Sequence, residues 1–484
     1  MIDGKRIYFL LTILSCLTAI LMGIIYIYTN SIQVLLFTVL LVLVSSILYT
    51  FNNLRYYIIH LLFYITIFIF LVSRPTIDYL KNGVLNTYQV DAYRFAFISV
   101  IISLVGLTIG GFLVSKKERV INNYNKNEER KNWVSYIRKT SLSVFIVSYP
   151  FYLIRLIERL IYRMNFSYYE YYANFKSELP YFTYILSTFV VYAMCIYLAT
   201  KPKKFYSALV LGAFVFANVI NLLVGTRNPF VLSVIFAFLY YFIRNQEEKD
   251  KWIGLKEKLV LYIGAPLMMV AMGLLNYVRD DAEINKTGVF DILLDFIYKQ
   301  GTSFGVLTRG YLYESNLPIK EFRNYTFSPI IEYFSKGNLA ILFGGRPFTA
   351  TNNSMELALQ SDRYPHNISY IVMKEEYLEG HGIGSSYIME IYTDYGLAGV
   401  FLFSILLGIL FILMMRIAYS GKILLFGMTL LVLNNLFFMP RSSFSESFFS
   451  LFTLQFWGII IVIFVSAGLL KNNIKYVVND TGGQ

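Results

Sequence analysis

Residues 380–400 read GHGIGSSYIMEIYTDYGLAGV, and they close the longest polar interruption in an otherwise apolar chain. The interruption begins at Arg279 and ends at Tyr395, where a further apolar run starts. A helix that crosses a membrane needs about 20 predominantly apolar residues. The stretch therefore marks the return of the chain into a membrane, and it predicts one large segment held together on one side.

Apolar runs long enough to cross a membrane lie on both sides of this segment. Of the 484 residues, 57% are hydrophobic and only 15% are charged, which is more apolar surface than a soluble protein can bury. We predict an all-α polytopic membrane protein with about twelve transmembrane helices. The predicted spans are residues 7–28, 31–50, 56–73, 94–115, 140–162, 181–200, 206–224, 229–243, 258–278, 396–415, 422–440 and 447–470.

The distribution of basic residues sets the predicted orientation. The net charge is +12, and lysines and arginines gather in alternate loops, such as KPKK at 201–204 and the tail from Lys471. Cytoplasmic loops of membrane proteins carry an excess of these residues. We therefore predict that both termini lie in the cytoplasm and that the charge serves topology rather than nucleic-acid binding.

This orientation divides the chain into three parts. Residues 1–278 hold the first nine predicted helices, and residues 279–395 form a large extracytoplasmic loop. Residues 396–484 hold the last three predicted helices and a cytoplasmic tail. The two cysteines both lie in apolar runs, so they imply no disulfide framework and no metal site.

Several arginines stand on the face that should hold few positive charges. They are Arg227 in GTRNPF, Arg279 in RDD, Arg346 in GGRPF and Arg441 in MPRSSFSES. A single interfacial arginine commonly anchors a helix, and GGRPF alone is compatible with a plain turn. A group of them favours a binding role, because the planar guanidinium holds phosphate oxygens bidentately. We therefore predict that these side chains converge on a phosphate or pyrophosphate.

Charged residues also occur within the fifth predicted span. Arg155, Glu158 and Arg159 fall at i, i+3 and i+4, so they share one helix face. Charges inside a span are tolerated when they are paired, wetted or able to reach the interface. Two interpretations stay open, a structural ion pair near the outer interface or a cationic wall facing a cavity.

The end of the long segment carries the candidate acid–base groups. His366 lies in PHNIS, and His381 lies in the glycine-rich turn GHGIG. A helical pattern follows this turn, and Ser385 or Ser386 would cap that helix. On that helix Glu390 and Asp394 are spaced i and i+4 and share a face. Two carboxylates in this place either include a general base or only solvate the helix end.

With these features the chain resembles the Wzy-type oligosaccharide repeat-unit polymerases, which make O-antigen and capsular polysaccharides. The resemblance rests on the polytopic layout, the large late extracytoplasmic loop, GTRNPF at 225–230 and GIGSSYIMEIYTDYGLAGVF at 382–401. It covers roughly residues 200–450. It implies a GT-C-like architecture. Related O-antigen ligases often carry a His-Asn pair where this chain has Ser385 and Ser386, which shifts the expected general base to Glu390, with His381 second.

The resemblance also implies a reaction. A sugar hydroxyl of one lipid-linked repeat unit attacks the anomeric carbon of a glycan carried on undecaprenyl pyrophosphate, and the pyrophosphate carrier leaves. The expected catalytic residues are Glu390, His381, Arg227 and Arg441, and the expected substrate-binding residues are Arg279, Arg346, Arg155, Arg159, His366 and Asp394. Arginines would stabilise the leaving group, so we expect no cofactor and no obligatory metal. The expected partners are the lipid-linked oligosaccharide, membrane lipid, a flippase and a chain-length regulator.

Two other functions stay open at this stage. A flippase or another transporter would suit many spans with intramembrane charges, although the chain shows no repeat symmetry of the kind that transporters often have. A ligase that moves glycan onto a different acceptor is the nearest enzymatic alternative, because sequence alone hardly separates acceptors.

Overall fold

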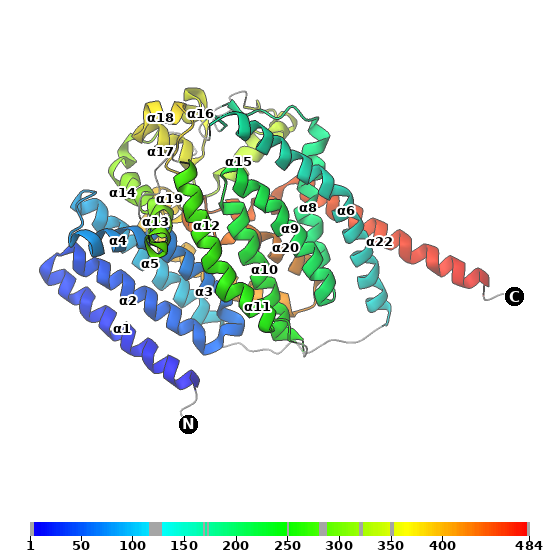
Figure 1. The fold of residues 1–484 in the computed structure, drawn as a ribbon, viewed down its shortest axis with the longest axis horizontal. Coiled ribbons are helices and arrows are strands. Elements are labelled where there is room, and N and C mark those ends of the chain that lie inside the picture. Colours follow the sequence, from blue (N-terminus) through cyan, green and yellow to red (C-terminus); the bar gives the residue numbers. More distant parts are fainter. Residues whose placement is uncertain are drawn as a thin grey trace.

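The structure is a computed structural model, and it describes residues 4–115, 128–167, 170–171, 174–248, 251–279, 288–318, 323–348 and 353–481. Within these ranges every regular element is a helix. The long helices lie side by side in one bundle, and α14, α16, α17 and α18 gather at one end of it (Figure 1). The predicted all-α fold is confirmed for the described residues.

The first half of the chain supplies most of the long helices. They are α1 (Gly4–Thr29), α2 (Ile32–Thr50), the short η1 (Phe51–Asn53), α3 (Leu54–Ile67), the π-helical turn η2 (Phe68–Val72), α4 (Ser73–Asn82), α5 (Val90–Ser115), α6 (Glu128–Asn165), α8 (Tyr181–Ala199), α9 (Lys204–Val224) and α10 (Asn228–Glu247).

The second half mixes long and short helices. They are α11 (Leu255–Leu259), the π-helical turn η3 (Val260–Gly264), α12 (Ala265–Arg279), α13 (Val289–Gln300), η4 (Gly301–Ser303), α14 (Phe304–Leu312), η5 (Glu314–Asn316), α15 (Ser328–Ser335), η6 (Asn338–Phe343), α16 (Met355–Gln360), α17 (Tyr364–Val372), α18 (Lys374–Leu378), α19 (Tyr387–Tyr419), α20 (Ile423–Leu436), η7 (Met439–Arg441), α21 (Glu446–Phe449), η8 (Ser450–Phe452) and α22 (Leu454–Thr481).

In the described part of the chain, nine helices are long and apolar enough to cross a membrane. One of them, Ile32–Asn82, runs through two of the predicted spans, because α2, α3 and α4 follow each other without a loop. The helix Ile423–Leu436 is apolar but shorter than the others. The multi-pass character is therefore confirmed, whereas the count of twelve stays a prediction.

The segment predicted as a long loop contains its own helices. From α13 to α18 it forms short helices, most of them with buried apolar residues such as Ile292, Phe296 and Leu307. Its helix α14 packs on both α5 and α19. The polar composition concealed this order, because helices of only two or three turns leave a weak periodic signal.

Helix α19 is the scaffold for the last part of this segment. It packs along α5 with backbones in close contact: a Cβ on Gly408 would lie 2.2 Å from the Leu107 carbonyl oxygen, and one on Gly110 would lie 2.1 Å from the Ile405 carbonyl oxygen. Small residues allow such close approach of helices in a membrane. The contact fixes α19 firmly against the core.

One residue breaks α19 into two arms. Gly396 has φ +66° and ψ −171°, a conformation essentially confined to glycine. The first arm, residues 387–395, therefore leaves the axis of the second, which begins where the predicted span begins. Ser386 occupies the N-cap position of the first arm, as predicted for one of the two serines, but its side chain makes no capping hydrogen bond.

Candidate functional site

Glu390 lies in the first arm of α19 and is completely buried. Its Oε1 accepts a hydrogen bond from the Ser385 hydroxyl at 2.7 Å, and its Oε2 accepts one from the Phe444 backbone N–H at 2.9 Å. The carboxylate thus bridges the start of α19 and the loop that follows η7. The predicted role of Glu390 as general base stays a prediction.

Arg441 ends η7, three residues before Phe444 in the same loop. Its guanidinium Nη1 donates hydrogen bonds to the backbone carbonyl and to the side-chain Oε1 of Gln300, both at 3.1 Å. Gln300 is the last residue of α13, so a cation meets the negative end of that helix dipole. The guanidinium also lies 5.8 Å from the centre of the Phe70 ring in η2. Two predicted catalytic residues, Glu390 and Arg441, therefore belong to one neighbourhood.

A further arginine, which was not among the predicted site residues, approaches the same end of α13. Arg74 is the second residue of α4, and its guanidinium carbon lies 4.7 Å from the centre of the Tyr298 ring. A Cβ on Gly301 would lie 2.6 Å from the Arg74 Cβ, so the two backbones touch. The Arg74 Nε is buried and has no hydrogen-bond partner. The sequence around Arg74 carried no distinct signal; the π-helical turn η2 before it, of a kind frequent at functional sites, is seen only in the structure.

The charges around the last turns of α13 do not cancel. Lys81 lies 5.6 Å from the Tyr298 ring centre, and Lys299 pairs with Asp295 at 3.4 Å. The carboxylate of Asp78, on α4, also interacts electrostatically with the Tyr298 hydroxyl. Arg74, Arg441 and the two lysines thus face two aspartates, which leaves a positive surplus near the ends of η2, α13 and α20.

Arg227 and Arg279 belong to elements that share a hydrophobic cluster with α13. Arg227 is the N-cap residue of α10, and three residues later Phe230 shares a hydrophobic cluster with Met272 of α12 and Phe296 of α13. Arg279 ends α12, and its side chain lies outside what the structure describes. The elements of Arg227, Arg279 and Arg441 are thus neighbours through α13, while convergence of the side chains on one ligand stays a prediction.

Asp394 ties the first arm of α19 to the start of α15. Its Oδ1 accepts from the Tyr325 backbone N–H at 3.1 Å, and its Oδ2 accepts from the backbone N–H and the hydroxyl of Thr326, both at 2.7 Å. The Tyr325 hydroxyl donates in turn to Asn367 Oδ1 at 2.8 Å. Asp394 therefore holds the fold of the long polar segment, and its predicted part in substrate binding is untested.

The two predicted histidines occupy different parts of the segment. His366, in α17, places its Nδ1 3.0 Å from the Tyr377 hydroxyl. Burial, and then the positive charge of Arg363, lower the pKa of His366, while Glu332 opposes them. Burial raises the pKa of Tyr377 to about 12. His381 lies in the predicted glycine-rich turn, and its backbone carbonyl accepts from Asn353 Nδ2 at 2.8 Å. Their predicted roles are untested.

The charged face in α6 makes contacts with the segment that follows it and with α8. The Glu158 carboxylate accepts from the Ser177 hydroxyl and from the backbone N–H groups of Glu178 and Leu179. Arg155 donates to the Ser187 hydroxyl at 3.2 Å and stacks over the Tyr184 ring. Glu158 thus orders the following loop, and Arg155 and the neighbouring Arg159 keep their predicted substrate-binding role as a proposal.

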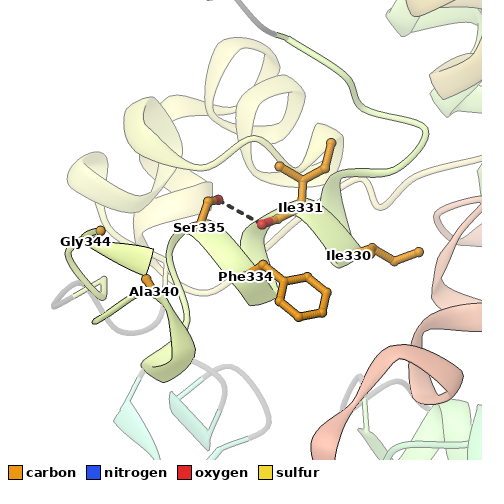
Figure 2. Close-up of a pocket in the computed structure, with 7 residues that line it drawn as sticks. Ile330, Ile331, Phe334, Ser335, Ala340 and Gly344 are labelled. Carbon is orange, nitrogen blue, oxygen red and sulfur yellow. Dashed lines mark hydrogen bonds between the residues drawn. The ribbon is translucent and has the colours of Figure 1, made fainter. Parts of the chain in front are cut away.

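Arg346 is exposed in the loop after η6. The preceding Gly344 and Gly345 line an open hollow of about 670 Å³ together with Ile330, Ile331, Phe334, Ser335 and Ala340 (Figure 2). Gly344 has φ +74°, and a Cβ on Gly345 would lie 2.9 Å from the Ser335 carbonyl oxygen. Both glycines are therefore explained by the turn itself. The lining is mostly apolar, and the predicted substrate-binding role of Arg346 stays a prediction.

A second ionic group supports the long polar segment, and its residues were also not among the predicted site residues. The Glu332 carboxylate in α15 accepts from the Ser361 hydroxyl, the Asp362 backbone N–H and the Arg363 Nε at 2.6–2.9 Å. Arg363 also approaches Glu446 of α21 at 3.9 Å. This links the long segment to the loop of Arg441 a second time. Charged residues spread over the polar segment gave no sequence signal for this pairing.

The geometry thus joins the long polar segment, the first arm of α19 and the loop after α20 around one basic region. A family model of the O-antigen polysaccharide polymerase Wzy matches residues 11–473, which is nearly the whole chain.

The chain belongs to the O-antigen polysaccharide polymerase Wzy family. Membership identifies a multi-pass membrane protein with a glycosyltransferase-like polysaccharide polymerase role and a lipid-linked oligosaccharide substrate. No curated protein and no solved structure matches the chain. The Wzy family assignment confirms the resemblance seen in the sequence and extends it into the first 200 residues.

Proposed function

We propose that the chain polymerises undecaprenyl-pyrophosphate-linked oligosaccharide repeat units at the outer face of the cytoplasmic membrane. The product would be a cell-surface polysaccharide such as a capsule, an exopolysaccharide or an O-antigen, and both termini would be cytoplasmic. The observation that carries the proposal is the meeting of Arg441 with the end of α13, because it brings the loop after α20 and the outer segment to one basic region.

The proposed reaction makes one bond and breaks another. The acceptor sugar hydroxyl forms a glycosidic bond with the anomeric carbon of the donor glycan, and the bond from that carbon to the diphosphate oxygen breaks. The hydroxyl proton passes to a general base, for which Glu390 and His381 are the predicted candidates. The diphosphate gains negative charge as it leaves, and arginines held in place before the reaction stabilise that charge.

Arg441 is the best-supported member of the proposed clamp. It is half-buried, so the charge is partly shielded from water, and its hydrogen bonds to Gln300 restrict its rotamers. Arg227 and Arg279 enter from α10 and α12; α12 packs on α13, and α10 shares a hydrophobic cluster with both. The lipid tails would stay in the bilayer while the sugars lie under the outer segment. We also propose a flippase and a chain-length regulator as partners, because the resemblance to the polymerase family implies both.

The test is reconstitution of the purified protein in vesicles with a lipid-linked repeat unit. We expect ladders of longer glycans on the lipid carrier. Movement of the repeat unit across the membrane without lengthening would instead support a flippase, and transfer to a different acceptor would support a ligase. Full ladders from an Arg227→Ala, Arg441→Ala double variant would show that the clamp assignment is wrong.

A further inference from the structure

Glu390 is held in a manner that suits a scaffold better than a proton acceptor. Both carboxylate oxygens already accept hydrogen bonds, from Ser385 and from the Phe444 backbone. The side chain is 0% exposed, so no substrate hydroxyl reaches it in this conformation. A buried carboxylate that joins two distant segments of the chain fixes their relative position.

The segments that Glu390 joins are the ones that frame Arg441. Phe444 lies three residues after Arg441, and at most about 11 Å separates the Cα atoms of two residues that far apart in sequence. On its other side Arg441 bonds Gln300. The loop is therefore held at two points, by α13 through Arg441 and by α19 through Glu390.

The surroundings of Glu390 indicate that this connection is made by polar groups and not by apolar packing alone. Ser386 lies four residues before Glu390, Ser445 lies in the loop of Arg441, and Ser447 lies in α21. All three are buried, and their hydroxyls have no hydrogen-bond partner. A carboxylate is the strongest acceptor available to such a loop. Loss of that acceptor leaves the Phe444 N–H as a further unsatisfied donor.

We infer that Glu390 is a positioning residue, whose carboxylate couples the first arm of α19 to the loop of Arg441 and so places that guanidinium. The inference rests on the proposed function, because it assigns Glu390 a part in the reaction only through Arg441. For the isosteric variant Glu390→Gln, a positioning role predicts a different result from the one expected of a general base. Glutamine keeps an oxygen for the Phe444 N–H, and its amide donates to the Ser385 hydroxyl.

The activity test compares Glu390→Gln, Glu390→Ala, Arg441→Ala and the double variant Glu390→Ala, Arg441→Ala in the reconstituted polymerase. We expect the glutamine variant to keep kcat within about threefold, whereas loss of a general base would lower it by about 10²–10⁴. The alanine variant should lose at least about tenfold in kcat. The double variant should be no slower than Arg441→Ala alone, because residues that act as one unit are non-additive.

A labelling test follows the loop itself and does not depend on activity. Ser442→Cys is introduced in a Cys16→Ser background, and its reaction rate with a maleimide is measured in the membrane. We expect the rate to rise at least fivefold with Glu390→Ala and to change little with Glu390→Gln. Should the alanine variant not accumulate, Glu390→Asp takes its place, since the shorter side chain cannot keep both contacts.

The outcomes separate the inference from the proposed function. A glutamine variant as slow as the alanine variant, with unchanged labelling, overturns the positioning role and restores the general base. Strictly additive losses in the double variant also overturn it. If Arg441→Ala is fully active but Glu390→Ala accelerates labelling, the loop is held by Glu390 as inferred and the arginine clamp of the proposed function is wrong.

Discussion

Replacement of Arg441 by alanine is expected to separate a structural loss from a catalytic one. The guanidinium makes two hydrogen bonds to Gln300, both at 3.1 Å. A hydrogen bond to a charged group contributes about 1.5–3 kcal/mol. The two bonds share one donor atom, Nη1, so they count as about one such bond, and half-burial places it in the lower part of that range. We therefore expect a loss of about 2 kcal/mol in the free energy of unfolding.

The catalytic loss should exceed what that destabilisation explains. Removal of one preorganised donor to a developing negative charge lowers kcat by about 10²–10³, or about 2.7–4 kcal/mol. The assay is the initial rate of glycan lengthening per folded protein, at saturating lipid-linked repeat unit. Gln300→Ala removes one of the two contacts of Arg441 but no cation, so it should share part of the stability loss and keep most of the rate.

Arg416 supplies a matched control for Arg441. It is also half-buried, and its Nη2 donates to the Val114 backbone carbonyl at 2.6 Å. It lies 20 residues beyond Gly396 on α19, about 30 Å along the helix from the arm that carries Glu390. Arg416→Ala should lower stability without a comparable fall in kcat. Equal rates for the Arg441→Ala and Arg416→Ala variants would refute the assignment of Arg441 to the site.

Three further predictions concern other parts of the chain. Arg74→Ala should lower kcat/KM by about 10–100-fold, because it removes a second cation near α13. Lys81→Ala, on the same helix, should keep kcat/KM within threefold of the unchanged protein. Equal effects of the two variants would exclude Arg74 from the site. Gly396→Ala should destabilise the protein by about 1–3 kcal/mol, seen as a lower Tm, since its backbone conformation excludes a side chain while the space around it is open. The lowered pKa of His366 means that the unfolded chain binds the proton more readily, so stability is full above the ordinary histidine pKa of about 6.5 and falls as the pH drops below it. In Tm measurements between pH 7.5 and 5.5, His366→Gln should flatten this decline, and an unchanged slope would contradict it.

Much of the class of this protein follows from composition and pattern. Apolar runs predict membrane helices because lipid offers backbone groups no hydrogen-bond partners, so each crossing segment must satisfy its own. The helix after GSS was predicted with Glu390 and Asp394 on it, and α19 contains both. Gly396, where the predicted span begins, proves to be the break between the two arms.

The helical order of the long polar segment could not be predicted with the same means. Helix α15 has eight residues and α17 has nine, too few for a periodic pattern to stand out from a polar loop. These helices are stabilised by tertiary contacts such as Glu332 with Arg363. Continuous helices such as Ile32–Asn82 also concealed their boundaries, which is why the number of spans is not fixed by hydropathy alone.

The sequence by itself determined that this is an all-helical, multi-pass Wzy family polymerase with candidate arginines and carboxylates spread along the chain. Only the tertiary structure decided which of them meet. The bonds from Glu390 to Phe444 and from Arg441 to Gln300 join residues 54 and 141 positions apart. Such pairs depend on how whole helices pack, through contacts like those of α5 with α19, and local residue preferences carry no information about them.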